Sequence, residues 1–153
     1  MIEFELGELS IKISEEVFEI MKSFIQDENH KPEAGGILIG HYLEDNNYSI
    51  TDVSSPSELD KSSRFNFTRS KKNAQKIINK IFKDSKGKKI YLGEWHTHPE
   101  HHPSPSATDL NEWHKICRQR QTPMVFLIVG WSGELWLGLS GGVEIERCML
   151  VSA

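Results

Sequence analysis

Residues 93–109, GEWHTHPEHHPSPSATD, decide how this sequence is interpreted, because they carry metal-ligand side chains at a regular spacing. The preceding residues 89–95, KKIYLGEW, predict a strand that runs into the motif. Alternate side chains of a strand share a face, so we expect His96 and His98 to point to one side and Thr97 to the other. The two imidazoles are therefore predicted to converge on one point.

A helix start follows the histidines. Three prolines between residues 99 and 105 end the strand and exclude a helix there. Residues 106–109 then form a Ser-x-x-acid capping pattern, with Ser106 as the N-cap and Asp109 one turn into the helix. This turn can bring a carboxylate back to the histidines. Two neutral imidazoles and one carboxylate occupy three positions of a tetrahedral zinc ion and leave the fourth for water, as in catalytic zinc sites.

A pair of glycines precedes an apolar strand further upstream, in residues 33–42, EAGGILIGHY. Glycines in this position indicate a close approach of another part of the backbone. The spacing alone predicts that Glu33 is a solvated loop residue, because glutamate is seldom buried in proteins.

Three patterns together resemble the signature of the JAMM (MPN-plus) metalloproteases. They are Glu-x-Gly-Gly-x-x-x-Gly at 33–40, His-x-His-Pro at 96–99 and Ser-x-x-Asp at 106–109, and the likeness extends over essentially the whole chain. The resemblance implies a zinc ion held by His96, His98 and Asp109. It also implies that Glu33 takes a proton from the attacking water and delivers it to the leaving amine, and that Ser106 steadies the oxyanion.

Two further histidines, His101 and His102, crowd the same loop and could in principle replace a ligand. The resemblance instead places them at the rim of the site. A zinc nucleobase deaminase would show His-x-Glu followed by Pro-Cys-x-x-Cys, and the sequence has no Pro-Cys-x-x-Cys.

The substrate class follows from the resemblance alone. JAMM enzymes cleave isopeptide or peptide bonds at the C-terminus of ubiquitin or ubiquitin-like proteins. The sequence of residues 95–110 is most similar to that of small bacterial family members found in antiphage (CBASS) operons. This resemblance implies that the enzyme releases a nucleotidyltransferase (CD-NTase) from the proteins to which it is conjugated. The predicted partner is a protein with an extended C-terminal tail that lies along a sheet edge. Two alternatives stay open: a protease that processes a small sulfur-carrier protein, and a non-catalytic MPN interaction module.

Length and composition predict one domain covering residues 1–153, since this length buries a single core. No apolar run can span a bilayer and no secretory signal opens the chain, so we expect a cytoplasmic protein without a membrane partner. Cys117 and Cys148 form no Cys-x-x-Cys pair, which argues for buried thiols and against a thiolate zinc site. The net charge of −4 argues against a nucleic-acid partner.

The periodicity of apolar residues predicts a single α/β domain with a mixed sheet flanked by helices, and the JAMM likeness implies a cytidine deaminase-like arrangement. Phe65 and Phe67 are predicted to share a strand face and to pack in the core. Lysines predominate between Arg69 and Lys89, and we interpret this basic helix face as solvated, with a docking surface as the alternative. Expected helices cover about 15–26, 70–84 and 107–121. A short hairpin or strand pair is expected over 2–13, and further strands over 37–42, 47–54, 64–69, 89–95, 124–130, 134–139 and 143–151.

Overall fold

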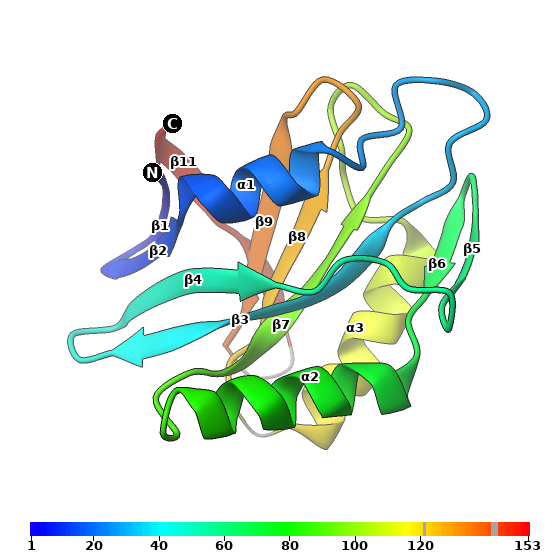
Figure 1. Cartoon of the computed structure of the whole chain (residues 1–153). Helices are drawn as coiled ribbons and strands as arrows, with labels where there is room; N and C mark the ends of the chain where they lie inside the picture. Colours follow the sequence, from blue (N-terminus) through cyan, green and yellow to red (C-terminus); the bar gives the residue numbers. More distant parts are fainter. Residues whose placement is uncertain (121, 142–143) are drawn as a thin grey trace.

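The computed structural model of this chain describes residues 1–120, 122–141 and 144–153. Within them, a central sheet carries α1 on one face and α2 and α3 on the other, and the two termini lie close together (Figure 1). The elements in chain order are β1 (Ile2–Leu6), β2 (Leu9–Ile13), α1 (Glu15–Lys22), β3 (Gly35–Leu43), β4 (Asn47–Val53), β5 (Lys61–Ser63), β6 (Asn66–Thr68), α2 (Lys71–Asp84), β7 (Ile90–Thr97), α3 (Ala107–Gln119), β8 (Val125–Val129), β9 (Leu135–Ser140), β10 (Ile145–Arg147) and β11 (Met149–Ser152).

The described strands form a nine-stranded sheet in the order β10-β9-β8-β7-β3-β4-β2-β1-β11, and β5 and β6 form a separate hairpin. Two neighbouring pairs, β2 with β4 and β7 with β8, are parallel, and the remaining pairs are antiparallel. The predicted single α/β fold with a mixed sheet is therefore confirmed. The strand that carries the histidines, β7, lies in the middle of this sheet.

Strand β8 shows why the sheet needs helices on both faces. All five of its residues are buried. Leu127 packs in the core cluster on the α1 side, together with Met21 of that helix. Phe126 and Ile128 point to the opposite face and pack against Trp113 of α3. A strand buried on both faces reads as a continuous apolar run, as residues 124–130, MVFLIVG, do.

The first helix is shorter than predicted. It begins after Ser14, whose hydroxyl accepts the N–H of Val17, and it ends at Lys22 rather than near Gln26. The apolar periodicity continues past the helix because Phe24 and Ile25 pack against the same core from an irregular segment. A helical period therefore persisted in the sequence after the helical backbone had ended.

The prediction that Phe65 packs in the core is wrong. The turn of the β5–β6 hairpin falls at residues 64–65, so the alternation of a strand stops there, and Phe65 is 76% exposed. Phe67 is half-buried and lies close to Gly35 at the start of β3. The hairpin thus reaches the neighbourhood of the paired glycines.

The C-terminal segment divides into two short strands instead of the single strand predicted for 143–151, of which residue 143 lies outside the described part. β10 pairs with β9 and β11 pairs with β1, so the segment meets both ends of the strand order. Cys148 lies between them, and its N–H donates to the carbonyl of Leu137. Burial, with Glu146 adding to it, raises the pKa of the Cys148 thiol to about 11, as fits the predicted buried thiol. Among the described helices, none has both the length and the hydrophobicity to cross a membrane.

Candidate metal centre

The end of β7 carries the two histidines of the motif. His96 and His98 are buried, and their Nε2 atoms lie 3.0 Å apart. The N–H of His98 donates to the carbonyl of Val129 at the end of β8, which continues the pairing of β7 and β8 by one residue. Thr97 points to the other side of the strand, where its hydroxyl forms hydrogen bonds with the N–H of Ala34 and the side chain of Gln26. The predicted sharing of a face by His96 and His98 is confirmed.

The start of α3 brings Asp109 to these histidines. Ser106 is the N-cap, and the capping box is complete: its hydroxyl accepts the N–H of Asp109 at 3.1 Å, and Asp109 Oδ2 accepts the N–H of Ser106 at 2.9 Å. The same Oδ2 lies 3.3 Å from His96 Nε2 and 3.0 Å from His98 Nε2. Burial raises the pKa of Asp109, but hydrogen bonds with His96 and His98 outweigh it and hold this pKa well below its usual range.

Glu33 reaches the cluster from the residues before β3. It is only 4% exposed, contrary to what its loop position suggests, and its Oε1 lies 3.7 Å from His98 Nε2. Burial raises the pKa of Glu33 to about 7; the charge of His98 opposes this shift and that of Asp109 adds to it. A carboxyl group with this pKa can accept and release a proton near neutral pH.

The paired glycines allow this approach. Gly35 is paired with His96 across the β3–β7 ladder. A Cβ on Gly35 would lie 2.5 Å from the carbonyl oxygen of Trp95, and one on Gly36 would lie 2.3 Å from the hydroxyl oxygen of Ser54. Both distances are far below van der Waals contact, so a side chain at Gly35 would push β3 away from β7 and the histidines, and one at Gly36 would push it away from Ser54. The close backbone approach predicted from the sequence is confirmed.

A buried polar chain joins the segments that carry Glu33 and the histidines. The hydroxyl of Thr97 accepts the N–H of Ala34 at 3.0 Å and donates to Gln26 Oε1 at 2.9 Å. Gln26 Nε2 in turn donates to the carbonyls of Lys31 and Arg64. Neither Gln26 nor Thr97 has a recognisable spacing to the motif, so the sequence alone predicts no role for them.

Glu100 is a further residue that the sequence analysis missed. Its Oε1 lies 2.7 Å from Nδ1 of His98, which faces away from the cluster. Burial lowers the pKa of His98, but hydrogen bonds with Asp109 and Glu100 outweigh it, so this pKa is raised. A carboxylate on the outer nitrogen of a histidine fixes the ring and its tautomer, as is common in metal sites. The sequence feature that could have identified Glu100 is its position, two residues after the second histidine of the motif.

The donor atoms of this cluster fit a metal ion. Ligands arranged tetrahedrally at about 2.0–2.2 Å from zinc lie about 3.3–3.6 Å from one another. The Nε2 atoms of His96 and His98 and the Oδ2 atom of Asp109 are separated by 3.0–3.3 Å, close to that spacing. Glu33 also lies within ligand distance of the two histidines, so two sets of three ligands share them. We favour Asp109 as the third ligand, because one of its oxygens lies within 3.3 Å of both Nε2 atoms, whereas Glu33 comes within ion-pair distance of His98 but not of His96.

The other histidines of the loop lie outside this cluster. His101 Nδ1 is 2.8 Å from the hydroxyl oxygen of Ser132, and His102 Nδ1 is 2.9 Å from a carboxylate oxygen of Glu134. Both histidines are exposed, as the rim position predicted from the sequence requires. Cys117, on α3, packs at the edge of the Trp113 cluster, which agrees with a packing role.

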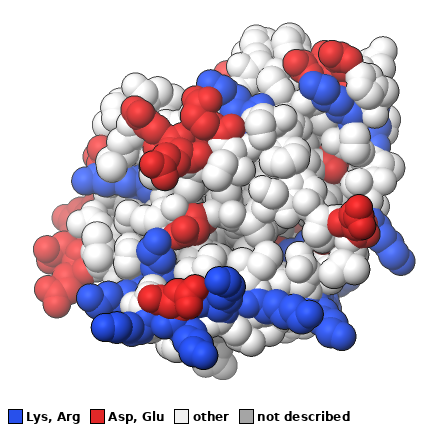
Figure 2. All heavy atoms as spheres, viewed as in Figure 1, with Lys and Arg blue, Asp and Glu red and all other residues white. Residues whose placement is uncertain are grey.

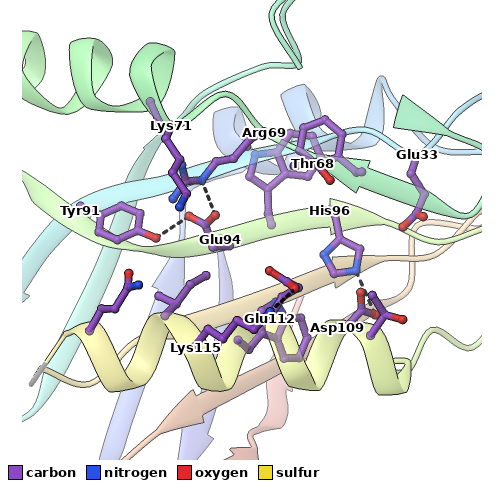
Figure 3. A pocket seen from close by; sticks show the side chains of 18 of the residues that line it. Glu33, Thr68, Arg69, Lys71, Tyr91, Glu94, His96, Asp109, Glu112 and Lys115 are labelled. Carbon is purple, nitrogen blue, oxygen red and sulfur yellow. Dashed lines mark hydrogen bonds and ion pairs between the residues drawn. The ribbon is translucent and has the colours of Figure 1, made fainter. Parts of the chain in front are cut away.

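A groove of about 470 Å³ begins at the cluster and continues between α2 and α3 over β7 (Figure 3). Glu33, His96 and Asp109 line one end of it. Figure 3 shows these three side chains together on the right and further charged groups along the groove to the left. A buried acid–base group beside two histidines and a carboxylate, at the end of an open groove, is the arrangement of a metal-dependent hydrolase.

Comparison with known proteins assigns this hydrolase to a family. The model of the prokaryotic homologues of the JAB domain matches residues 18–137, and the chain belongs to this family. A CD-NTase/cGAS isopeptidase of Escherichia coli (strain TW11681) is 36% identical over 137 residues, covering 90% of this chain and 86% of that protein. One of Vibrio cholerae (serotype O1, El Tor Inaba N16961) is 38% identical over 116 residues, covering 76% and 72%.

Two more distant likenesses agree with this assignment. A probable metalloprotease, y4qB, of Sinorhizobium fredii is 28% identical over 130 residues, covering 78% of this chain and 79% of that protein. The solution structure of protein DSY2949 from Desulfitobacterium hafniense superimposes with a TM-score of 0.59 and 21% identity, covering 89% of each chain, which shows the shared fold. Family and relatives together identify this chain as a hydrolytic metalloprotease.

Proposed function

We propose that this protein is a zinc-dependent isopeptidase that cleaves after the C-terminal residue of a conjugated protein. The conjugated protein is a CD-NTase of a bacterial antiphage (CBASS) system, released from its targets in the cytoplasm. The names of the relatives that match along most of their length support this substrate. The groove beside the cluster supports it as well, because an extended C-terminal tail fits an open groove better than a folded surface does.

In this proposal His96, His98 and Asp109 hold the metal. Two imidazole nitrogens and one carboxylate oxygen suit zinc and leave a coordination position for water. When bound, the ion lowers the pKa of its water to about 7 and polarises the scissile carbonyl. Glu100 keeps the His98 ring oriented through its hydrogen bond to Nδ1.

Glu33 moves the proton. Its ionised carboxylate takes the proton of the attacking water, and its protonated form then gives that proton to the leaving amine. The burial of Glu33 keeps bulk water from competing for this proton. Ser106 supports the developing oxyanion: the bond from the Asp109 N–H uses only an acceptor site of its hydroxyl, so its hydrogen stays available for donation.

One observation carries the proposal: the approach of Glu33 Oε1 to within 3.7 Å of His98 Nε2. A purely structural zinc site is closed by a fourth protein ligand, whereas Glu33 lies within ion-pair distance of His98 but not of His96 and has a pKa near neutrality, as suits a group that accepts a proton from water. The same observation counts against the non-catalytic interaction module, which needs no proton acceptor. Processing of a small sulfur-carrier protein would use the same residues and differ only in substrate.

The proposal is tested by intact-mass analysis of a fusion in which the C-terminal tail of a CBASS CD-NTase precedes a second protein. Wild-type enzyme should cut directly after the native C-terminal residue of the tail. Glu33→Ala and chelator-treated enzyme should leave the fusion intact, whereas Glu8→Ala, which removes an exposed carboxylate in the β1–β2 turn, should cut normally. A fusion left intact by zinc-loaded wild-type enzyme would exclude this substrate, and the same assay with a sulfur-carrier fusion tests the alternative.

A further inference from the structure

The groove runs along β7 and α3, which are antiparallel to each other. Its two ends are therefore lined by different residues. At one end Asp109 lies beside His96. At the other end the Cζ atom of Arg120 lies 4.5 Å from the ring centroid of Tyr91. A helix rises about 1.5 Å per residue, so α3 spans roughly 16 Å between Asp109 and Arg120. Strand β7 spans roughly the same distance between His96 and Tyr91, which corresponds to about five residues of an extended chain.

The two ends differ in charge. Glu33 and Asp109 occupy the metal end, whereas Arg69, Lys71 and Arg120 line the opposite part. This basic end stands out in a chain whose net charge is −4. It joins the lysines and arginines that gather over α2 along the bottom of the view in Figure 2. The basic part of the groove therefore favours an anionic group.

The carboxylates in the basic part of the groove already have partners. Glu94 accepts hydrogen bonds from Arg69 Nε and from the hydroxyl of Tyr91, both drawn in Figure 3. Glu112 pairs with Lys115 at 3.2 Å. The charge of Arg69 is therefore already matched by Glu94.

Two cations of the groove remain for a ligand. In the part of the chain that the structure describes, neither Lys71 nor Arg120 has a carboxylate within ion-pair distance. The residues outside that part, at 121 and 142–143, are a glutamine, a glycine and a valine, none of which carries a charge. Gln75 and Gln119 line the same region and add amide groups that can hydrogen-bond a carboxylate.

We infer that the basic end of the groove is a specificity subsite for an acidic side chain of the substrate, two to five residues from the scissile bond. The lower limit is the position of Glu94 and its partner Arg69, two residues before His96 on β7. The upper limit is the position of Tyr91 and Arg120. The inference deepens the proposed function and rests on it for the identity of the reaction. Arg120 and Lys71 contact the acid directly, and Glu94 holds Arg69 beside it.

The first experiment selects peptides without requiring cleavage. A randomised twelve-residue peptide library is displayed and bound to zinc-loaded Glu33→Gln protein, which retains the groove. We expect Asp or Glu to be enriched at one position of the selected peptides. The same selection on Glu33→Gln/Arg120→Gln protein should lose this enrichment. Uniform composition at every position in the first selection would overturn the subsite.

The second experiment measures affinity by fluorescence anisotropy. One selected peptide is made in two forms that differ only by Glu or Gln at the enriched position. A partly exposed charge pair contributes roughly 1 kcal/mol, so the Glu form should bind about fivefold more tightly, and less so at high salt. Arg120→Gln should abolish this ratio. Arg118→Gln removes the same charge from an exposed position of α3 outside the groove and should preserve it.

A charge reversal guards against a merely damaged groove. Arg120→Glu should prefer a peptide with Lys at the selected position over one with Glu, a gain that unfolding cannot produce. A preference for Glu that survives Arg120→Gln and Lys71→Gln would refute the assignment. Failure of the CD-NTase fusion to be cut, with the Arg120-dependent selection intact, would remove the proposed substrate and leave the subsite. Cutting of the CD-NTase fusion, with no preference for an acidic residue in the peptide selection, would leave the proposed substrate and refute the subsite.

Discussion

The hydroxyl of Thr97 donates a hydrogen bond to the side chain of Gln26, 71 positions away, at 2.9 Å. The same hydroxyl accepts the N–H of Ala34, the residue that follows Glu33. All three residues are buried. This contact fixes the segment that carries Glu33 to the strand that carries His96 and His98.

Replacing this hydroxyl by a methyl group tests its role. Thr97→Val keeps the side-chain shape but leaves the Ala34 N–H and the Gln26 carbonyl oxygen without their partner, which costs about 1–3 kcal/mol of unfolding free energy. We expect a lower midpoint in urea unfolding and a fall in kcat/KM, because Glu33 is no longer held. Thr51→Val, on β4, loses only a hydrogen bond to the neighbouring Asp52 and should change both quantities little. Equal urea midpoints for Thr97→Val and wild type would show that the contact does not contribute to stability.

The ligand assignment predicts which substitutions release the metal. His98→Ala and Asp109→Ala should each reduce bound zinc well below one ion per chain after dialysis, measured by mass spectrometry of the metal. His102→Ala is the matched control, because this histidine lies in the same loop but pairs with Glu134 on the surface. It should keep its zinc. Full zinc content in Asp109→Ala together with loss in Glu33→Ala would instead identify Glu33 as the third ligand.

Glu100 is predicted to act on the metal only through His98. Glu100→Ala removes the partner of Nδ1, and such a loss typically weakens metal binding about 10- to 100-fold. Competition with a zinc chelator of known affinity measures this change. Glu134→Ala, which removes the equivalent partner of the exposed His102, should leave zinc affinity unchanged. Activity at saturating zinc should recover in Glu100→Ala, since the ligands themselves are intact; activity that stays low would assign Glu100 a direct part in the reaction.

Local spacing made the histidines and the start of α3 predictable. A strand fixes which side chains share a face, and a capping box fixes where a helix begins, so His96, His98 and Ser106 needed no tertiary information. The burial of Glu33 did not follow from spacing, because it depends on the β3–β7 ladder, which pairs residues 50 to 61 positions apart, from Gly40 with Ile90 to Gly35 with His96. The helical spacing of apolar residues continues to Phe24, past the end of α1. Phe65 has the spacing expected of a strand but lies in a turn. In both cases the apolar pattern alone did not determine the secondary structure. The backbone hydrogen bonds determine where a helix or a strand ends.

The raised pKa of Glu33 should make the stability of the metal-free protein depend on pH. The folded-state pKa of Glu33, about 7, exceeds the ordinary glutamate value of 4.5 because burial disfavours the ionised form. The protonated form is therefore favoured by folding, and the resulting stability is present below pH 4.5 and is lost as the pH rises through 7. Glu33→Gln cannot ionise and keeps a neutral side chain of similar shape. In metal-free protein it should gain stability over wild type between pH 5 and 8, by an amount on the order of 3 kcal/mol. Thermal unfolding in chelator at a series of pH values measures this difference, with Glu8→Gln as a control expected to show none. A difference that is constant with pH would mean that Glu33 titrates at its ordinary value, and the proton-shuttle role would then depend on the bound metal rather than on burial.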